Sequence, residues 1–244
     1  MKFSATIRTT KEFKTAISSI QGLIEEATFY VNKDGIKFRG LEPSHVRYLE
    51  VTFPADRFLS FNIEDELKFT IKPNDFLEVV KRAKDGDQIT IEVEKENAPL
   101  NVHIEGRKHF TLGLISIEHD APVPHFKFPS KTVMPYSNFS DYVKDIAVVG
   151  SNFVVEIEEG KMKISGKGDR GKVEVDAEGS MVQIQEGKIK SEFAIDFLVE
   201  AIKTFGTAFE SITVETGNNM PLSLTLDSPA MGTIQYVQAH KQLS

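Results

Sequence analysis

The sequence predicts an α+β protein made of two copies of one domain, each with antiparallel sheets covering a pair of helices. Three observations support this prediction. The two halves align with each other in the same order, four short segments carry helical apolar stripes, and most of the remainder alternates as β-strands do. With 244 residues, of which 40% are hydrophobic and 27% charged, the chain has a globular composition and room for two domains.

The internal duplication extends over most of the chain. Residues Phe13–Gly40 align with Phe139–Gly166 at an offset of 126 residues. Further matches follow in the same order, and they pair Asp75–Leu77 with Asp196–Leu198, Ile89–Glu92 with Ile212–Glu215, and Pro99–Ile104 with Pro221–Leu226. Between the halves lies the proline-bearing segment Glu118–Ser130, which we expect to be extended and semi-rigid. We therefore predict domains at residues 1–117 and 131–244, with a connector at 118–130.

Four segments are predicted to form helices of about three turns. Their shared stripe has the i, i+3, i+4, i+7 spacing of one buried helix face. The stripes are Phe13/Ala16/Ile17/Ile20, Phe76/Val79/Val80/Ala83, Phe139/Tyr142/Val143/Ile146 and Leu198/Ala201/Ile202/Phe205. A candidate N-cap precedes or opens each segment (Thr10, Asn74, Ser137, Asp196), and a glycine follows it (Gly22, Gly86, Gly150, Gly206).

The other regular segments are predicted to be strands. In the first half they are Lys2–Arg8, Ala27–Val31, Ile36–Gly40, Val46–Phe53, Leu67–Ile71, Gln88–Glu94, Leu100–Glu105 and Phe110–Ile117. The repeating unit is β-α-β-β-β, used twice in each half. Such sheets leave open edges at Phe110–Ile117 and Val173–Asp176, and open edges can pair with another chain.

The charge balance argues against a protein that binds nucleic acid over its whole surface. Lys and Arg number 29 and Asp and Glu 36, which gives a net charge of −7. The four helical segments differ from the rest because their charges cancel. Their basic residues are Lys11, Lys14, Lys81, Arg82, Lys84, Lys144 and Lys203. An ordinary solvated helix face is the simplest interpretation of these residues taken alone.

No catalytic or metal-binding pattern stands out. The chain has no Cys, which excludes disulfides, thiolate zinc sites and a Cys nucleophile. Its six His form neither an HxH nor an HExxH pattern, and His103 and His109 are expected at the surface of strands. We therefore predict no enzyme, no metal site and no cofactor, with an unidentified hydrolase as a remote alternative. The sequence also shows no signal peptide and no apolar run long enough to span a membrane.

Several segments resemble the sliding clamps of archaea and eukaryotes, the proliferating cell nuclear antigen family. They are Leu41–Val46, Phe76–Ala83, Ser165–Asp169, Met220–Leu222 and Met231–Tyr236. The resemblance implies the DNA-clamp fold and a ring of three chains, with sheets outside and twelve helices lining a hole. Helices about 10 Å wide would leave a bore of roughly 28 Å, wide enough for a duplex.

The resemblance also implies site residues. The residues expected to face DNA are Lys11, Lys14, Lys81, Lys144 and Lys203. The pocket expected to dock partner peptides is formed by Leu41, His45, Tyr48, Val123, Pro124, Pro221, Val237 and Ala239. The subunit interface is expected at Arg82, Lys84, Lys108, Phe110, Leu112, Asp141, Asp145, Val173 and Val175. Asp141 and Asp145 are like charges at i, i+4, an arrangement that favours a cationic neighbour.

The expected partners are two further clamp subunits, double-stranded DNA without sequence specificity, and a clamp loader, DNA polymerase, flap nuclease and ligase that bind through short peptides. No membrane partner is expected, and the location would be intracellular, with DNA. A homotrimer is the first expectation. The alternatives are one subunit of a heterotrimer, or a scaffold or enzyme that forms no ring.

Overall fold

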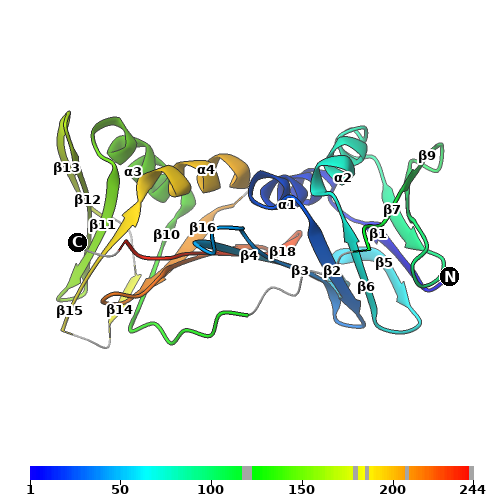
Figure 1. Ribbon diagram of the computed structural model, residues 1–244, viewed down its shortest axis with the longest axis horizontal. Coiled ribbons are helices and arrows are strands. Elements are labelled where there is room, and N and C mark those ends of the chain that lie inside the picture. The colour runs from blue at the N-terminus through cyan, green and yellow to red at the C-terminus, as the bar shows by residue number, and fades with distance from the viewer. Residues whose placement is uncertain (117–122, 178–180, 185–186, 207–208, 242–244) are drawn as a thin grey trace. The chain divides into compact units, whose positions relative to one another are not determined.

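The computed structural model describes residues 1–116, 123–177, 181–184, 187–206 and 209–241 (Figure 1). The chain forms two compact units. The first unit consists of Met1–Glu42, Leu49–Val123 and Ser228–Ile234, and the second of Pro43–Tyr48, Pro124–Asp227 and Gln235–Ser244. The predicted boundary at residues 117 and 118 lies outside the described residues, so the predicted division into two domains and a connector stays a prediction.

The element order repeats along the chain. The first half contains β1 (Phe3–Ile7), α1 (Thr10–Leu23), β2 (Ala27–Asn32), β3 (Gly35–Leu41), β4 (Arg47–Pro54), a 3-10 turn (Ala55–Arg57), β5 (Phe58–Ile63), β6 (Leu67–Ile71), α2 (Pro73–Val80), β7 (Ile89–Val93), β8 (Leu100–Ile104) and β9 (Lys108–Leu112). The second half contains β10 (Ser130–Pro135), α3 (Tyr136–Val149), β11 (Asn152–Glu158), β12 (Lys161–Gly168), β13 (Gly171–Asp176), β14 (Met181–Ile184), β15 (Lys188–Ala194), α4 (Ile195–Phe205), β16 (Ser211–Thr216), β17 (Leu222–Ser228) and β18 (Gly232–Gln238).

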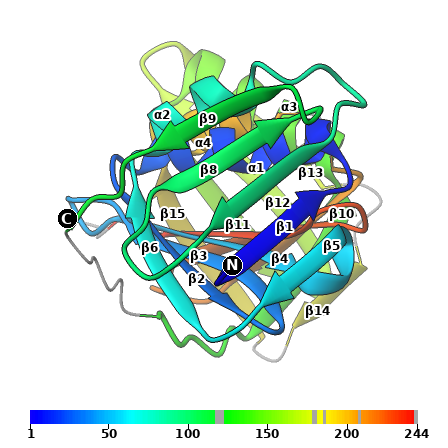
Figure 2. The same cartoon turned by 90° about the vertical axis from the view of Figure 1, so that its right-hand side faces the viewer.

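The sheets have the same strand order in both halves. One run of strands is β5-β1-β7-β8-β9, seen face-on in Figure 2, and its counterpart is β14-β10-β16-β17-β18. The other run is β4-β3-β2-β6, and its counterpart is β13-β12-β11-β15. The neighbouring strands β1 and β7, like β10 and β16, pair antiparallel. The predicted α+β fold with repeated β-α-β-β-β units is confirmed.

The predicted apolar stripes form the core of each unit. Of their sixteen residues only Tyr142 is half-buried, and the others are buried. In the first unit the Phe13 ring on α1 lies 5.4 Å from the Phe53 ring and 6.0 Å from that of Phe76. In the second unit the Phe139 ring on α3 lies 5.9 Å from that of Phe153. Burying such rings stabilises each unit by roughly 1.5–3 kcal/mol per side chain.

The predicted helix ends were partly wrong. None of the four helices has a side-chain hydrogen bond at its N-cap, and Thr10, Asn74, Ser137 and Asp196 all lie within the first turn. Gly22 lies inside α1, since Leu23 still belongs to the helix. Helix α2 has only 8 residues, about two turns, because Lys81 leads into a tight turn and loop rather than a third turn.

The strand predictions missed one element in each half. Strands β5 and β14 pair with β1 and β10, and neither was predicted. Strand β9 ends at Leu112, earlier than the predicted end at Ile117, which lies outside the described residues. A tight hairpin turn at Glu159 and Gly160 joins β11 to β12, and both residues have the positive φ that such a turn requires. Over the described parts of the chain, no helix has the length and apolar character to cross a membrane.

Candidate functional site

The five lysines expected to face DNA all lie on or beside the helices. Lys11 and Lys14 lie on α1, Lys81 follows α2 directly, Lys144 lies on α3 and Lys203 on α4. All except Lys14 are exposed. These lysines fall at positions between the buried stripe residues. The helical period that forms the core therefore leaves a basic residue on the exposed side of each helix or directly after it.

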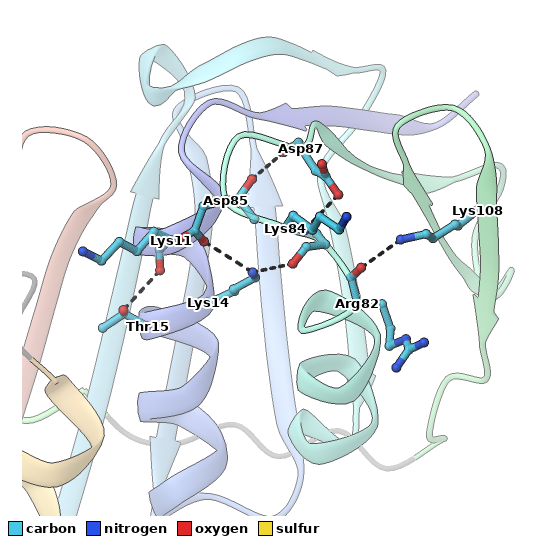
Figure 3. Close-up of polar contacts among 10 residues, drawn as sticks. Lys11, Lys14, Thr15, Arg82, Lys84, Asp85, Asp87 and Lys108 are labelled. Carbon is cyan, nitrogen blue, oxygen red and sulfur yellow. Dashed lines mark hydrogen bonds and ion pairs between the residues drawn. The ribbon is translucent and has the colours of Figure 1, made fainter.

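Lys14 connects the two helices of the first unit (Figure 3). Its ammonium group donates a hydrogen bond to the Ala83 carbonyl at 2.5 Å and lies 3.7 Å from the Asp85 carboxylate. The side chain of Lys14 is 22% exposed. The loop after α2 is thereby attached to α1. Its short charged residues, Asp85 and Asp87, were missed by sequence reasoning, although the Asp-Gly-Asp turn at 85–87 is a signal for such a loop.

Two other lysines pair with carboxylates on their own helices. The Nζ atom of Lys81 lies 3.0 Å from Oε1 of Glu78, and the Nζ atom of Lys144 lies 3.0 Å from Oδ1 of Asp141. Exposed pairs of this kind contribute about 0–1 kcal/mol, so a phosphate can replace the carboxylate at small cost. Among the described residues, no carboxylate forms an ion pair with Lys11 or Lys203. These two lysines therefore offer the most available positive charge.

The basic residues of the expected subunit interface gather beside β9. The Lys108 ammonium group donates a hydrogen bond to the Arg82 carbonyl at 3.0 Å, which attaches β9 to the loop after α2. The backbone N–H of Lys84 donates to the Asp87 carboxylate at 2.8 Å. Figure 3 shows these residues in the same region as Lys14. The residues expected to contact DNA and those expected to join subunits thus meet in one loop.

Strands β9 and β13 are edge strands. Strand β9 ends the run β5-β1-β7-β8-β9, and β13 ends the run β13-β12-β11-β15. Phe110 and Leu112 on β9 are half-buried, as are Val173 and Val175 on β13, and the residues between them are exposed. An edge strand with half-buried apolar side chains has the form of a surface that another strand can cover.

The acidic residues of the expected interface lie beside the second edge. Asp141 and Asp145 are exposed on α3, and α3 contacts β13. On β13 itself, a hydrogen bond from Lys172 lowers the pKa of the Glu174 carboxyl, so Glu174 stays ionised. The α3 residues Asp141 and Asp145 beside β13 are acidic, although β13 itself carries Lys172, whereas the edge at β9 has Arg82, Lys84 and Lys108.

The residues of the expected docking pocket are divided between the units. Those in the second unit are His45, Tyr48, Pro124, Pro221, Val237 and Ala239, and those in the first unit are Leu41 and Val123. In the second unit, the Ala239 N–H donates to the Val46 carbonyl at 2.8 Å, which brings the segment before β4 beside the end of β18. Tyr48 and Val237 are buried, whereas His45 is exposed with a φ of 61°.

Similarity to known proteins decides the family. The DNA polymerase sliding clamp of Nitrosopumilus maritimus is 30% identical to this chain over 244 residues, which cover 98% of both proteins. The chain belongs to the DNA sliding clamp family. The family profile described as "Proliferating cell nuclear antigen, N-terminal domain" matches residues 2–122. The DNA polymerase sliding clamp of Cenarchaeum symbiosum is 29% identical, again over 98% of each protein.

A solved structure supports the fold of this clamp. Proliferating cell nuclear antigen from Thermococcus kodakaraensis superposes with a TM-score of 0.88, at 22% identity, over 98% of this chain and 100% of that one. Within the described part of the clamp, no group of three or more His, Asp or Glu side chains is placed to hold a metal ion.

Proposed function

We propose that three copies of this clamp form a closed ring around duplex DNA and hold DNA polymerase on its template. The proposal rests on family membership and, above all, on one observation in the chain itself. It carries two different edge strands, β9 with basic neighbours and β13 with acidic neighbours. Edges of this kind suit a head-to-tail contact between identical chains, and such contacts form a ring when the rotation from one chain to the next closes.

The duplicated topology supports pairing of these two edges. Strand β9 occupies the same place in its run of strands as β18, and β13 the same place as β4. In the second unit, the segment entering β4 lies beside the end of β18, through the hydrogen bond between Val46 and Ala239. We infer that β9 of one chain and β13 of the next repeat this arrangement at each joint.

The distribution of charge favours identical subunits over a mixture of different ones. Lys108 lies on β9 with Arg82 and Lys84 in the neighbouring loop, and Asp141 and Asp145 lie on α3 beside β13. Because both sets belong to one chain, the basic set of each copy can pair with the acidic set of the next copy. The second candidate function is one subunit of a heterotrimer. In such a subunit the basic and the acidic set would not need to occur on the same chain.

Duplex DNA would lie against the helices. The lysines at positions 11, 14, 81, 144 and 203 would meet phosphates, which are identical at every base step, so contact would be independent of sequence and weakened by salt. The net charge of −7 would keep DNA away from the remaining surface. The clamp would act inside the cell on DNA, without catalysis and without a cofactor.

The partner enzymes would bind through short peptides. The residues proposed to receive them are Leu41, His45, Tyr48, Val123, Pro124, Pro221, Val237 and Ala239. These residues are largely apolar, which suits a short helical peptide with aliphatic and aromatic anchors. A clamp loader, DNA polymerase, flap nuclease and ligase are the proposed clients.

The ring is tested by reversing charge at one joint surface. Asp141→Lys with Asp145→Lys would place basic residues against Arg82 and Lys84, and light scattering should then show monomers where the parent clamp is a trimer. Adding Arg82→Glu and Lys84→Glu to the same chain restores complementarity and should restore the trimer.

The control variant carries Asp65→Lys and Glu66→Lys, two exposed reversals between β5 and β6, and it should remain a trimer. A trimer that persists in the Asp141/Asp145 variant would refute this joint, and a monomeric parent clamp would refute the ring. For a trimer, retention on circular duplex and loss from linear duplex is the expected sign of encirclement.

A further inference from the structure

The run β5-β1-β7-β8-β9 has one apolar face and one polar face. On β1, β7 and β8 the buried residues alternate with half-buried polar ones, as a strand period of two requires. On the polar face, side-chain hydrogen bonds cross from strand to strand, for example between Thr6 and Thr90 at 3.1 Å. Neither DNA contact nor subunit joining uses this face, and it holds two of the six histidines.

His103 on β8 and His109 on β9 are directly opposite each other in the strand register. Their Nδ1 atoms are 2.6 Å apart, and their ring centroids are 4.9 Å apart. Two imidazole nitrogens this close share one hydrogen, since a lone pair on one must face an N–H on the other.

Glu92 determines which nitrogen of His103 carries a hydrogen. The Nε2 atom of His103 lies 3.1 Å from Oε2 of Glu92 on β7, and a carboxylate can only accept. His103 therefore donates from Nε2 and presents the lone pair of Nδ1 to His109. The hydroxyl of Ser4 in turn donates to Oε1 of Glu92 at 3.2 Å. The side chains of His103 and Glu92 are 26% and 23% exposed, so their neighbours limit their movement.

We propose that His103 and His109 bind a divalent transition-metal ion of the Zn²⁺ class through their Nδ1 atoms, with Glu92 as a positioning residue. A histidine that binds metal through one nitrogen and donates to a carboxylate through the other is a frequent arrangement. In this site the ion takes the place of the hydrogen shared by the two rings, and His109 stays neutral by carrying its hydrogen on Nε2 instead.

The geometry requires a small adjustment. Two nitrogens on a tetrahedral Zn²⁺, each at about 2.0–2.1 Å, are about 3.3 Å apart. The Nδ1 atoms, now 2.6 Å apart, would separate by about 0.7 Å, which a modest rotation of the exposed His109 ring provides. No third ligating side chain converges here among the described residues, so water would complete the coordination. The bound ion would link the edge strand β9 to β8.

Calorimetric titration of the untagged full chain with ZnCl₂ tests the site. The parent clamp should bind one ion per chain, and His103→Gln or His109→Gln should each weaken that binding at least tenfold. The matched control is His125→Gln, which alters an exposed histidine elsewhere and should leave binding unchanged. Equal binding by the parent clamp and the His103 or His109 variants would overturn the proposal.

The role of Glu92 has its own measurement. Glu92→Gln should keep the one-to-one stoichiometry and weaken affinity by about tenfold, the effect typical of a lost carboxylate behind a ligand. Unchanged affinity in this variant would remove Glu92 from the site.

The Asp141/Asp145 charge-reversal variant separates this proposal from the ring. The metal site lies within one chain, so that variant should bind Zn²⁺ as the parent clamp does, whatever its oligomeric state. A loss of Zn²⁺ binding in that variant would overturn a site confined to one chain.

Discussion

The two helix pairs share a fold but carry opposite charge. The segments Thr10–Leu23 and Pro73–Lys84 contain five basic and three acidic residues, whereas Tyr136–Val149 and Ile195–Phe205 contain two basic and four acidic. The stripes lie at matching helix positions in both pairs, although some matched residues differ in size, as Ala16 and Tyr142 do. The exposed faces were free to diverge after duplication. In the proposed ring, the first unit would therefore supply most of the attraction to DNA, and the second would supply the acidic surface for its neighbour.

The helix pairs are also held together differently. In the first unit, Thr10 donates to the Asp87 carbonyl at 2.5 Å, next to the contact between Lys14 and Ala83. In the second unit, Tyr136 stands at the position of Thr10 and donates to the Ile202 carbonyl at 3.2 Å. Burial raises the pKa of the Tyr136 hydroxyl to about 12, so it remains a donor throughout the physiological range.

Phe13→Ala and Phe139→Ala test whether the two cores are equivalent. Each substitution removes a buried ring from matched positions, and each should lower the free energy of unfolding by about 3–5 kcal/mol. Denaturant titration measures both losses. A small loss at one position and a large loss at the other would show that the cores have diverged as the surfaces have.

Lys11→Ala with Lys14→Ala, compared with Lys144→Ala and Lys203→Ala, tests the division of DNA contact. The first pair should make the dependence of log K on log salt shallower by about 2 per chain, because Lys11 forms no ion pair among the described residues and Lys14 can exchange the exposed Asp85 for a phosphate. The second pair should have a smaller effect, since Asp141 and Asp145 already oppose phosphate there. Fluorescence anisotropy with a labelled duplex, across a salt series, gives both slopes. Equal slopes would contradict the asymmetry.

Tyr136→Phe and Thr10→Val compare the two links between helices. Tyr136→Phe leaves the buried Ile202 carbonyl without its donor and should cost about 1 kcal/mol of stability. Thr10→Val should cost less, because Asp87 is partly exposed and water can replace the lost donor. Thermal unfolding of the two variants provides the comparison, and a reversed order would contradict it.

Acid should weaken a cross-strand ion pair in the second unit. The matching pair in the first unit has an aromatic ring in place of the carboxylate. Glu156 lies opposite Lys190, whereas at the matching positions Lys68 lies over the Tyr30 ring at 5.2 Å. The hydrogen bond from Lys190 lowers the pKa of Glu156 below 4.5. Its stabilising effect is therefore complete above pH 4.5 and is lost as the pH falls through the lowered value.

Glu156→Gln tests this acid effect. The substitution should lower the free energy of unfolding by less than about 1 kcal/mol at neutral pH. It should also reduce the loss of stability between about pH 5 and pH 3. Tyr30→Phe, which keeps the ring beneath Lys68, should leave the acid dependence unchanged. An identical acid profile for Glu156→Gln and the parent clamp would contradict the role of this pair.

The sequence was sufficient to predict features that depend on periodicity. The stripe from Phe13 to Ile20 and the repeated β-α-β-β-β order of elements follow from local patterns, and both are confirmed. Features that depend on distant contacts were not predictable. Lys14 meets Ala83 across 69 residues, and nothing in the sequence around either residue indicates that contact. The N-cap residues were misplaced by one or two positions, since a polar residue near a helix start fits several positions equally well.

The unlike edges of the chain would also protect it before the proposed assembly. An open edge strand can pair with a copy of itself, and repeated pairing of that kind leads to aggregation. Two β9 edges brought together would place Lys108 and Arg82 against their own copies, and two β13 edges would oppose their acidic neighbours. If the proposed ring forms, pairing of two like edges would therefore be less favourable than pairing of β9 with β13.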